Sequence, residues 1–411
     1  MRKVRKDSKG RILHNGETYR KDKALYCFTY MDAMGVRRYL YSQDLGKLRE
    51  KEKQVTYDRL DGLDTYVLAR ADLNYVFDRY ISTKTELRST TKTNYVSNYN
   101  RYVRNGFGKK KISEIRYSDV LLYYSSLMNH YHLGLATIDN VHCCIHPALQ
   151  MAVRDNVIRS NPSDGVIAEI KKKQKGRPEP RHALTYEQEM FFLSALDEPE
   201  NIRWRPFFTV MFGTGLRIGE LIGLRWQDVS FKDNYITIDH NLTYYKRVDK
   251  GFKTEFEISL PKTNAGIRTV PMLDKVKKAL LEEKEYQFKT GKRCIMEIDG
   301  MSGFIFFNRF GMVHTPSSVN RIINRITDDY NAKEELKAAR ERREPELIPH
   351  FSNHITRHTF CSRLCENETN VKVIQSVMGH KDIQTTLDIY AEVSEKKRQD
   401  VFKDLNVNNV I

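Results

Sequence analysis

Six side chains in the second half of the sequence have the chemistry to act on a phosphodiester. They are Arg217, Lys262, His354, Arg357, His380 and Tyr390. Displacement at phosphorus spreads negative charge over the non-bridging oxygens, and planar guanidinium groups bind such oxygens through paired hydrogen bonds. A tyrosine hydroxyl has a pKa of about 10, so it attacks phosphorus at neutral pH only beside a base or among cations. The set therefore predicts attack by a tyrosine on a DNA phosphate, with preorganised cations as the electrostatic stabiliser.

The spacing within the motifs predicts how local structure presents these groups. TGLRIGEL predicts a glycine turn that leads into a helix, with Arg217 in the first turn and Glu220 three residues later on the same face. PKTNAG predicts the tip of a hairpin between two strands, which holds Lys262 out at a turn. HITRH places His354 and Arg357 at i and i+3 on one helical face.

His380 and Tyr390 complete the set, ten residues apart, in MGH and TLDIY. Taken alone, each motif has a plainer explanation. A lone arginine on a helix is more often part of a surface ion pair, and a lone tyrosine near a C-terminus usually packs against a core. The order and the shared chemistry of the motifs together favour a phosphate site.

Four longer motifs follow one another in the chain: TGLRIGEL, PKTNAGIRTVP, HITRHTF and VMGHKDIQTTLDIY. In content and order they resemble those of the tyrosine recombinases, and within that family the integrases of conjugative transposons and lambda-type phages. The resemblance covers nearly the whole chain. It implies an enzyme, a tyrosine-type DNA strand transferase that performs site-specific recombination for a mobile genetic element.

The resemblance also implies a role for each residue that matches a family motif. Arg217 and Arg357 match the two arginines that bind the phosphate. Lys262 resembles the lysine on a β-hairpin that protonates the leaving 5′ oxygen. Tyr390 matches the nucleophile.

Three more matching residues have supporting roles in the family. His354 resembles the histidine that handles the proton of the tyrosine, His380 falls where a histidine or tryptophan bonds to the phosphate, and Glu220 matches the acid that supports the site. Two positions depart from the family pattern: Gly219 stands where serine is common, and Thr356 where leucine usually precedes the second arginine. Neither departure removes a reacting group.

The implied mechanism needs no cofactor and no metal, because a 3′-phosphotyrosine conserves the energy of the broken bond. The freed 5′-hydroxyl then attacks a partner duplex, and the reaction proceeds through a Holliday junction. The implied partners are double-stranded DNA and further copies of the chain, as a homotetramer on two duplexes with the segment after Tyr390 packed on a neighbouring subunit. An excisionase and a host DNA-bending protein are implied by the resemblance alone.

The segments that precede the motifs are predicted to form DNA-binding modules. Residues 1–60 are predicted to form two strands, at 25–31 and 36–41, followed by a helix from Leu45, and the resemblance makes them an arm-type DNA-binding domain. Such a sheet could enter a major groove, although a basic β-module that binds protein is the alternative. Residues 65–165 have helical periodicity and predict a bundle that binds core DNA.

A basic linker is predicted at residues 166–182, and the catalytic domain at 183–411. The expected fold class is therefore multidomain α+β, with a small amino-terminal sheet, a helical bundle and a mainly helical catalytic domain that contains a small antiparallel sheet. The candidate DNA contacts are basic residues ahead of the catalytic domain. They are Arg37, Arg38, Lys109, Lys110, Lys111, Lys171, Lys172 and Lys173.

Charge and composition agree with this interpretation. The net charge of +16 is concentrated early, with +8 in residues 1–60, +5 in 65–165 and +4 in 166–182, as in a protein that grips nucleic acid. No apolar run approaches the roughly 18 residues of a membrane span, and no secretory signal is readable. Six scattered cysteines make no disulfide framework, so a reducing cytosol is the expected location, and the resemblance implies a bacterial cytoplasm with action at the nucleoid.

Competing interpretations remain at this point. A type IB topoisomerase shares the chemistry but relaxes DNA alone, and a non-catalytic DNA-binding protein could use the same scaffold. Cys361 and Cys365 recur with His354 and His358 near helical spacing, but structural zinc rarely takes four ligands from successive turns of one helix. These cysteines are expected to be small buried apolar residues instead.

Overall fold

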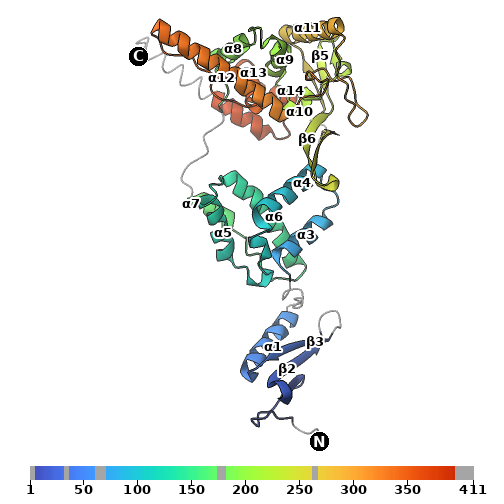
Figure 1. The fold of residues 1–411 in the computed structure, drawn as a ribbon, viewed down its shortest axis with the longest axis vertical. Coiled ribbons are helices and arrows are strands. Elements are labelled where there is room, and N and C mark those ends of the chain that lie inside the picture. The colour runs from blue at the N-terminus through green and yellow to red at the C-terminus, as the bar shows by residue number, and fades with distance from the viewer. Residues whose placement is uncertain (1–4, 32–36, 61–70, 174–181, 262–266, 394–411) are drawn as a thin grey trace. The chain divides into compact units, whose positions relative to one another are not determined.

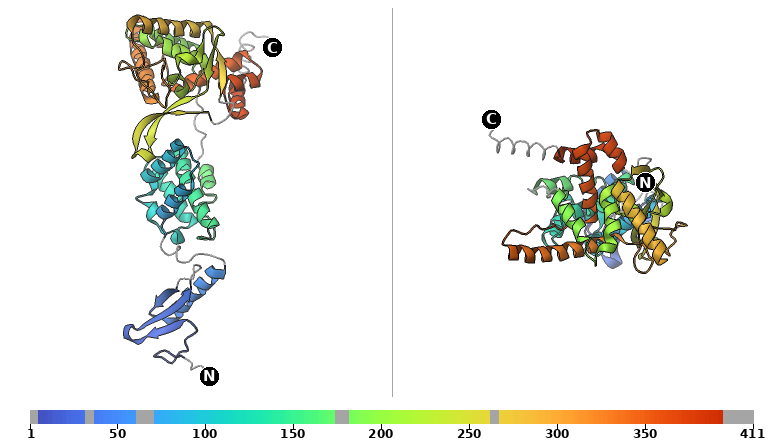
Figure 2. Two further views of the ribbon diagram at one scale, coloured as in Figure 1. Left: turned by 90° about the vertical axis from the view of Figure 1, so that its right-hand side faces the viewer. Right: turned by 90° about the horizontal axis from the view of Figure 1, so that it is seen from above.

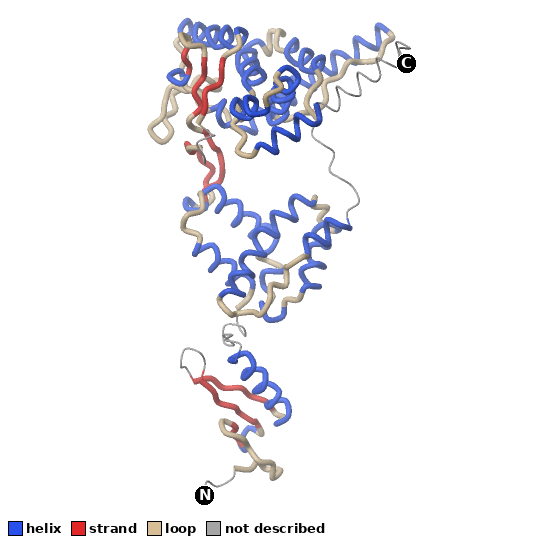
Figure 3. The backbone as a smooth tube through the Cα atoms, turned by 180° about the vertical axis from the view of Figure 1, so that it is seen from behind, coloured by secondary structure: helices blue, strands red, loops and turns tan. Residues whose placement is uncertain are grey.

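The computed structural model describes residues 5–31, 37–60, 71–173, 182–261 and 267–393 (Figure 1). The chain divides into two compact units. The first comprises residues 1–176 with 246–253, and the second comprises 177–245 with 254–411. Helices dominate both units, and strands are confined to small antiparallel sheets (Figure 3). The expected α+β class is confirmed.

The first described segment is a three-stranded antiparallel sheet with one helix. The strands β1 (Glu17–Arg20), β2 (Leu25–Met31) and β3 (Arg37–Ser42) pair in the order β1-β2-β3, and α1 (Leu45–Leu60) follows. A small core forms where Leu45 and Leu48 of the helix meet the sheet. The helix begins at the predicted residue and runs through Leu60.

A bundle of helices occupies the rest of the first unit. Its helices are α3 (Leu73–Thr83), α4 (Ser89–Asn98), α5 (Tyr117–Asn129), α6 (Leu135–Arg154) and α7 (Val166–Lys173). Leu73, Val76, Phe77 and Tyr80 lie on one face of α3 at helical spacing and are all buried in the bundle core. Phe77 stacks on Tyr99, with ring centroids 3.6 Å apart.

The predicted linker begins later than the sequence suggested. Residues 166–173 form α7, and its Val166 and Ile170 lie in the core of the bundle. Ile167 packs against the same core, and the three lysines that end the helix made this stretch resemble a basic linker. The remainder of the predicted linker, residues 174–181, lies outside the described residues.

The second unit is mainly helical around one large apolar core. Its helices are α8 (Tyr186–Ala195), α9 (Arg205–Thr214), α10 (Ile218–Ile222), α11 (Asp274–Thr290), α12 (Pro316–Glu341), α13 (Asn353–Asn367) and α14 (Val371–Met378), and residues 383–393 are also helical. The central helix α9 packs against α11 and α13, and α14 contacts α13 and β8. This packing brings residues far apart in the sequence to one place.

The strands that follow α10 form two small sheets. One contains β4 (Val229–Ser230), β5 (Tyr235–Ile238) and β8 (Arg268–Pro271), and the other pairs β6 (Asn241–Arg247) with β7 (Lys253–Ser259). Figure 2 shows β6 and β7 side by side as a hairpin.

The predicted hairpin around Lys262 is wrong in its pairing. The strands on either side of residues 262–266 are β7 and β8, and they pair with β6 and β5 rather than with each other. The segment thus connects two sheets. Lys262 itself lies outside the described residues.

Among the described residues, no helix is both long enough and apolar enough to cross a membrane.

Candidate active site

Within the motif TGLRIGEL, Arg217 binds Glu220 at the start of α10. Arg217 is the N-cap residue, and its backbone N–H donates to Glu220 Oε2 at 2.8 Å. Its Nη1 donates to Glu220 Oε1 at 2.9 Å. One carboxylate thus satisfies an otherwise unpaired helix-end N–H and orients the guanidinium, as the spacing of three residues predicts.

Arg268 is the site residue that sequence reasoning missed. It begins β8 and binds the same carboxylate from the other side, with Nη1 to Glu220 Oε1 at 3.0 Å and Nη2 to Oε2 at 2.8 Å. Its Nε donates to the carbonyl oxygen of Val377 at 2.9 Å. Strand alternation could have revealed it, because Arg268 and Val270 share the buried face of β8 and a buried arginine needs an acidic partner.

Arg357 lies on α13 and is almost fully buried. Its Nη1 donates to the carbonyl oxygen of Gly215 at 2.7 Å, and its Nη2 donates to the carbonyl oxygen of Met378. Both carbonyls come from C-terminal ends of helices, Gly215 from the end of α9 and Met378 from the end of α14.

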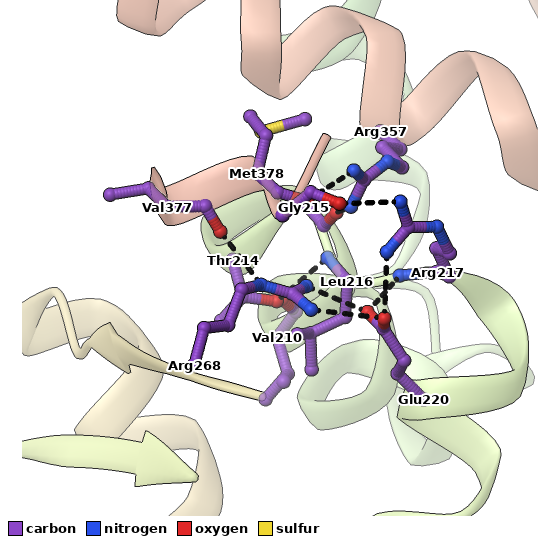
Figure 4. A network of polar contacts seen from close by, with 11 residues as sticks. Val210, Thr214, Gly215, Leu216, Arg217, Glu220, Arg268, Arg357, Val377 and Met378 are labelled. Atoms are coloured by element: carbon purple, nitrogen blue, oxygen red, sulfur yellow. Dashed lines mark hydrogen bonds and ion pairs between the residues drawn. The ribbon is translucent and has the colours of Figure 1, made fainter. Parts of the chain in front are cut away.

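The end of α14 binds all three arginines (Figure 4). Three successive carbonyls, at Val377, Met378 and Gly379, accept from Arg268, Arg357 and Arg217 respectively, the last at 2.9 Å. The last carbonyls of a helix have no partner within it, and the helix dipole makes this end negative. The C-terminus of α14 therefore organises the cations of the site.

Glycines make two of these contacts possible. Gly215 and Gly379 end their helices in the left-handed region, with φ of 60° and 62°. A Cβ at Gly215 would lie 2.3 Å from the ring of Phe360, and one at Gly379 would lie 3.0 Å from the Arg268 guanidinium. A larger residue at either position would both strain the backbone and displace a neighbour.

The network carries an excess of positive charge. Arg217 and Arg268 bind the Glu220 carboxylate, and Arg357 binds the same helix end, so three guanidinium groups and one carboxylate leave a formal net charge of +2. Burial alone would raise the pKa of Glu220, but hydrogen bonds and charge from Arg268, with the charge of Arg217, lower it to about 2. Burial, and then repulsion from Arg217, lower the pKa of Arg357 to about 9. An anion bound here would relieve that repulsion.

The two predicted histidines differ in environment. His380 follows Gly379 directly, and its Nδ1 lies 3.0 Å from the hydroxyl of Thr386. Burial, and then the charges of Arg357 and Arg217, lower the pKa of His380 to about 4, so it is neutral at pH 7. His354 is exposed in the first turn of α13, one turn ahead of Arg357.

Tyr390 is half-buried on the helical segment 383–393 and packs against a small apolar core. That core includes Cys361 and Cys365 of α13, which confirms them as buried apolar residues, and Met378 of α14. Met378 is also the residue whose carbonyl holds Arg357. The predicted nucleophile and the arginine network therefore share one support, the end of α14.

The basic residues predicted to contact DNA differ in their ion pairs and in their exposure. Lys110 pairs with Asp119 at 2.8 Å, and Lys171 pairs with Asp139 at 2.9 Å. The side chains without an ion pair to a described residue are exposed, and they are Arg37, Lys109, Lys111 and Lys172. Arg38 is half-buried on β3, and the side chain of Lys173 lies outside the described residues.

Acidic and histidine side chains gather elsewhere in the described part of the second unit, at Asp228, Asp239 and His240. Internal contacts account for this group. Asp228 binds Arg225 at 2.9 Å, and the two ring nitrogens of His240 face Asp239 and the carbonyl oxygen of Gly223. The arginine network shares no residue with it.

Two families match separate parts of the sequence. Residues 182–397 match the phage integrase family, and residues 1–59 match the DNA-binding domain of the Tn916 integrase. The transposases from transposon Tn1545 of Streptococcus agalactiae and from Tn916 of Enterococcus faecalis are each 28% identical to this chain, over 99% of it and 98% of their own length.

Solved structures show the same fold. The Tn1549 transposon integrase in complex with transposon right end DNA superposes with a TM-score of 0.68 at 25% identity, over 80% of this chain and 99% of that one. A lambda integrase tetramer bound to a Holliday junction matches with a TM-score of 0.50 at 18% identity, over 91% of this chain and 94% of that one.

Proposed function

Because this chain belongs to the phage integrase family of tyrosine recombinases, we propose that it is the site-specific integrase of a conjugative transposon and that the arginine network binds the scissile phosphate. The observation that carries the proposal is the convergence of Arg217, Arg268 and Arg357 on one helix end, next to the small core that holds Tyr390. A net positive, largely buried site of this kind suits a phosphodiester.

In the proposed reaction the hydroxyl oxygen of Tyr390 attacks the phosphorus. The bond from phosphorus to the 5′ oxygen breaks, which leaves a 3′-phosphotyrosine and a 5′-hydroxyl. Arg217 and Arg357 hold the non-bridging oxygens, and Lys262 supplies the proton for the departing 5′ oxygen. The 5′-hydroxyl of a partner strand then reverses the step and releases Tyr390.

The remaining groups have supporting roles in this proposal. His354, exposed one turn from Arg357, receives the tyrosine proton. His380, neutral at pH 7, donates a hydrogen bond to the phosphate from the ring nitrogen that does not face Thr386. Glu220 keeps Arg217 and Arg268 in place through its two oxygens.

The relatives extend the proposal to DNA and to assembly. The Tn1549 integrase is seen on DNA, and the lambda integrase as a tetramer on a Holliday junction, so we assign both states to this chain. Residues 1–60 would bind arm sites, 65–165 core DNA, and 183–411 would perform catalysis. An excisionase and a host DNA-bending protein would direct the reaction, in the bacterial cytoplasm where the element's DNA lies.

A nicked suicide substrate tests the function. Wild-type protein should accumulate a covalent DNA adduct that runs slowly on a denaturing gel, and Tyr390→Phe should bind the DNA but form none. Tyr330→Phe, at another half-buried tyrosine of the same unit, is the matched control and should form the adduct normally. Adduct formation by Tyr390→Phe at the wild-type rate would refute the assignment.

A further inference from the structure

A cavity of about 640 Å³ opens in the second unit apart from the arginine network. It lies between α11, the first turns of α12 and the segment 292–314, and its volume is within the range of natural ligand pockets. None of the described residues assigned to the reaction lines it. A ligand of this cavity would therefore be distinct from the scissile phosphate.

The floor of the cavity is aromatic and uncharged. Phe207 and Phe306 are buried there with ring centroids 5.0 Å apart, and the ring of Trp204 lies 4.9 Å from that of His314. Burial, with the charge of Arg203, lowers the pKa of His314 to about 4, so this ring is neutral at pH 7. Such a floor suits an inserted aromatic side chain.

The rim of the cavity is cationic. No Asp or Glu is among the described residues that line it, and Lys292, Arg309 and Arg321 form no ion pair with any of the described residues. Arg203 differs, because its Nη2 donates to Glu283 at 2.6 Å while its guanidinium lies 3.9 Å from the centroid of the Tyr286 ring. The three rim cations are therefore available to acidic groups of a ligand.

Phe310 stands at the mouth with 64% of its surface exposed. A formed turn holds it there: the side-chain oxygen of Asn308 accepts from the backbone N–H of Phe310 at 2.9 Å and of Met312 at 3.2 Å, and Gly311 takes a φ of 74°. The guanidinium of Arg309 lies 4.7 Å from the Phe310 ring centroid. An aromatic ring held in solvent beside unpaired cations is typical of a recognition surface.

We propose that this cavity is a docking site for an acidic segment of another protein that inserts an aromatic side chain. Carboxylates of the segment would pair with the rim, and the ring would reach the aromatic floor. The chain's own residues 394–411 are a poor match, because they contain four basic and three acidic residues. Duplex DNA has the required charge, but its bases are stacked inside and cannot fill the floor.

Binding of synthetic copolymers to the full-length protein tests the proposal. The probe is a fluorescein-labelled random copolymer of glutamate and tyrosine, with polyglutamate and a lysine–tyrosine copolymer for comparison. The Glu–Tyr copolymer should bind and change the emission of Trp204, a signal that Trp204→Phe removes. The double variant Arg309→Glu/Arg321→Glu should bind it about tenfold or more weakly.

Lys278→Glu is the matched charge reversal, on an exposed side chain of α11 that does not line the cavity, and it should leave binding within about twofold. The double variant should still form the DNA adduct, which shows that it is folded. Equal binding of polyglutamate would refute insertion of a ring. Displacement of the probe by a peptide of residues 394–411, or by core-site DNA, would show that a different occupant uses the cavity and overturn the proposal.

Discussion

Two arginines reach Glu220 from very different distances along the chain. Arg217 is three residues away and forms part of the same helix cap, so the motif spacing was enough to predict the pair. Arg268 is 48 residues away, and the tertiary packing that places β8 beside the end of α14 also brings it to Glu220 of α10. Local geometry is predictable from sequence, whereas this second contact depends on tertiary structure.

The shape of the guanidinium group should matter more than its charge. Arg217→Lys and Arg357→Lys keep the charge but remove the planar pair of donors, so each should lower the rate of DNA cleavage by roughly 10²–10³. Single-turnover cleavage of a core-site duplex measures the effect. Arg343→Lys, in an ion pair with Glu334 outside the network, is the control. Cleavage within about threefold of wild type would remove that arginine from the phosphate site.

Glu220 should make stability depend on pH in the acid range. Its pKa falls from the ordinary 4.5 to about 2 on folding, so its charged form stabilises the native state above pH 4.5, and this contribution disappears as the pH drops towards 2. The loss is on the order of 3 kcal/mol. Urea unfolding between pH 5 and pH 2.5 should show a steeper decline for wild type than for Glu220→Gln. Parallel declines would contradict the buried pairing.

At the scale of elements, α14 connects the proposed nucleophile, Tyr390, to the arginines. Its last carbonyls hold Arg217, Arg268 and Arg357, and its Met378 lies in the core that packs Tyr390. A shift of this short helix would disturb the cations and the tyrosine together.

Two helix-ending glycines allow this coupling to be tested. Gly379→Ala forces a left-handed alanine against Arg268, whereas Gly291→Ala, at the end of α11, has the same backbone conformation with nothing within 4 Å. Each should lose roughly 1–2 kcal/mol of stability. Only Gly379→Ala should also slow cleavage, by about tenfold or more. Equal cleavage by the two variants would show that the end of α14 does not position the site.

The elements themselves are predictable from sequence to different degrees. The amphipathic face of α3 and the start of α1 follow from local periodicity, and both predictions are confirmed. Strand pairing around residues 262–266 does not follow from local periodicity, because β7 pairs with β6 and β8 pairs with β5. Strands that are neighbours in the sequence are often paired, but here the hairpin of β6 and β7 is inserted between β5 and β8, which pair with each other. The sequence does not reveal α7, because its apolar positions, Val166 and Ile170, are followed by lysines.

At the scale of the whole molecule, charge and catalysis are assigned to different parts of the chain. Residues 1–60 hold a net +8 of the total +16 and none of the proposed reacting residues. A protein without them should still form the Tyr390 adduct on a short core-site duplex. Its binding to DNA with distal sites should depend less on salt. The slope of log K against the logarithm of the salt concentration should be smaller in magnitude by about 0.9 for every phosphate that residues 1–60 neutralise.

Titration of both proteins on long and short DNA across a salt series measures this difference, and recombination of the long substrate should be weakened or abolished. If the isolated 1–60 segment binds no DNA and its deletion changes neither slope nor recombination, the arm-binding assignment is wrong. The catalytic assignment rests on different residues and would stand.

The most direct test of the account is the identity of the residue joined to DNA. Full-length protein is trapped on a suicide substrate, digested with protease and nuclease, and the nucleotide-bearing peptide is sequenced by mass spectrometry. We expect a single linkage, from the hydroxyl oxygen of Tyr390 to a 3′-phosphate. A linkage to any other residue, or to a 5′-phosphate, would contradict it.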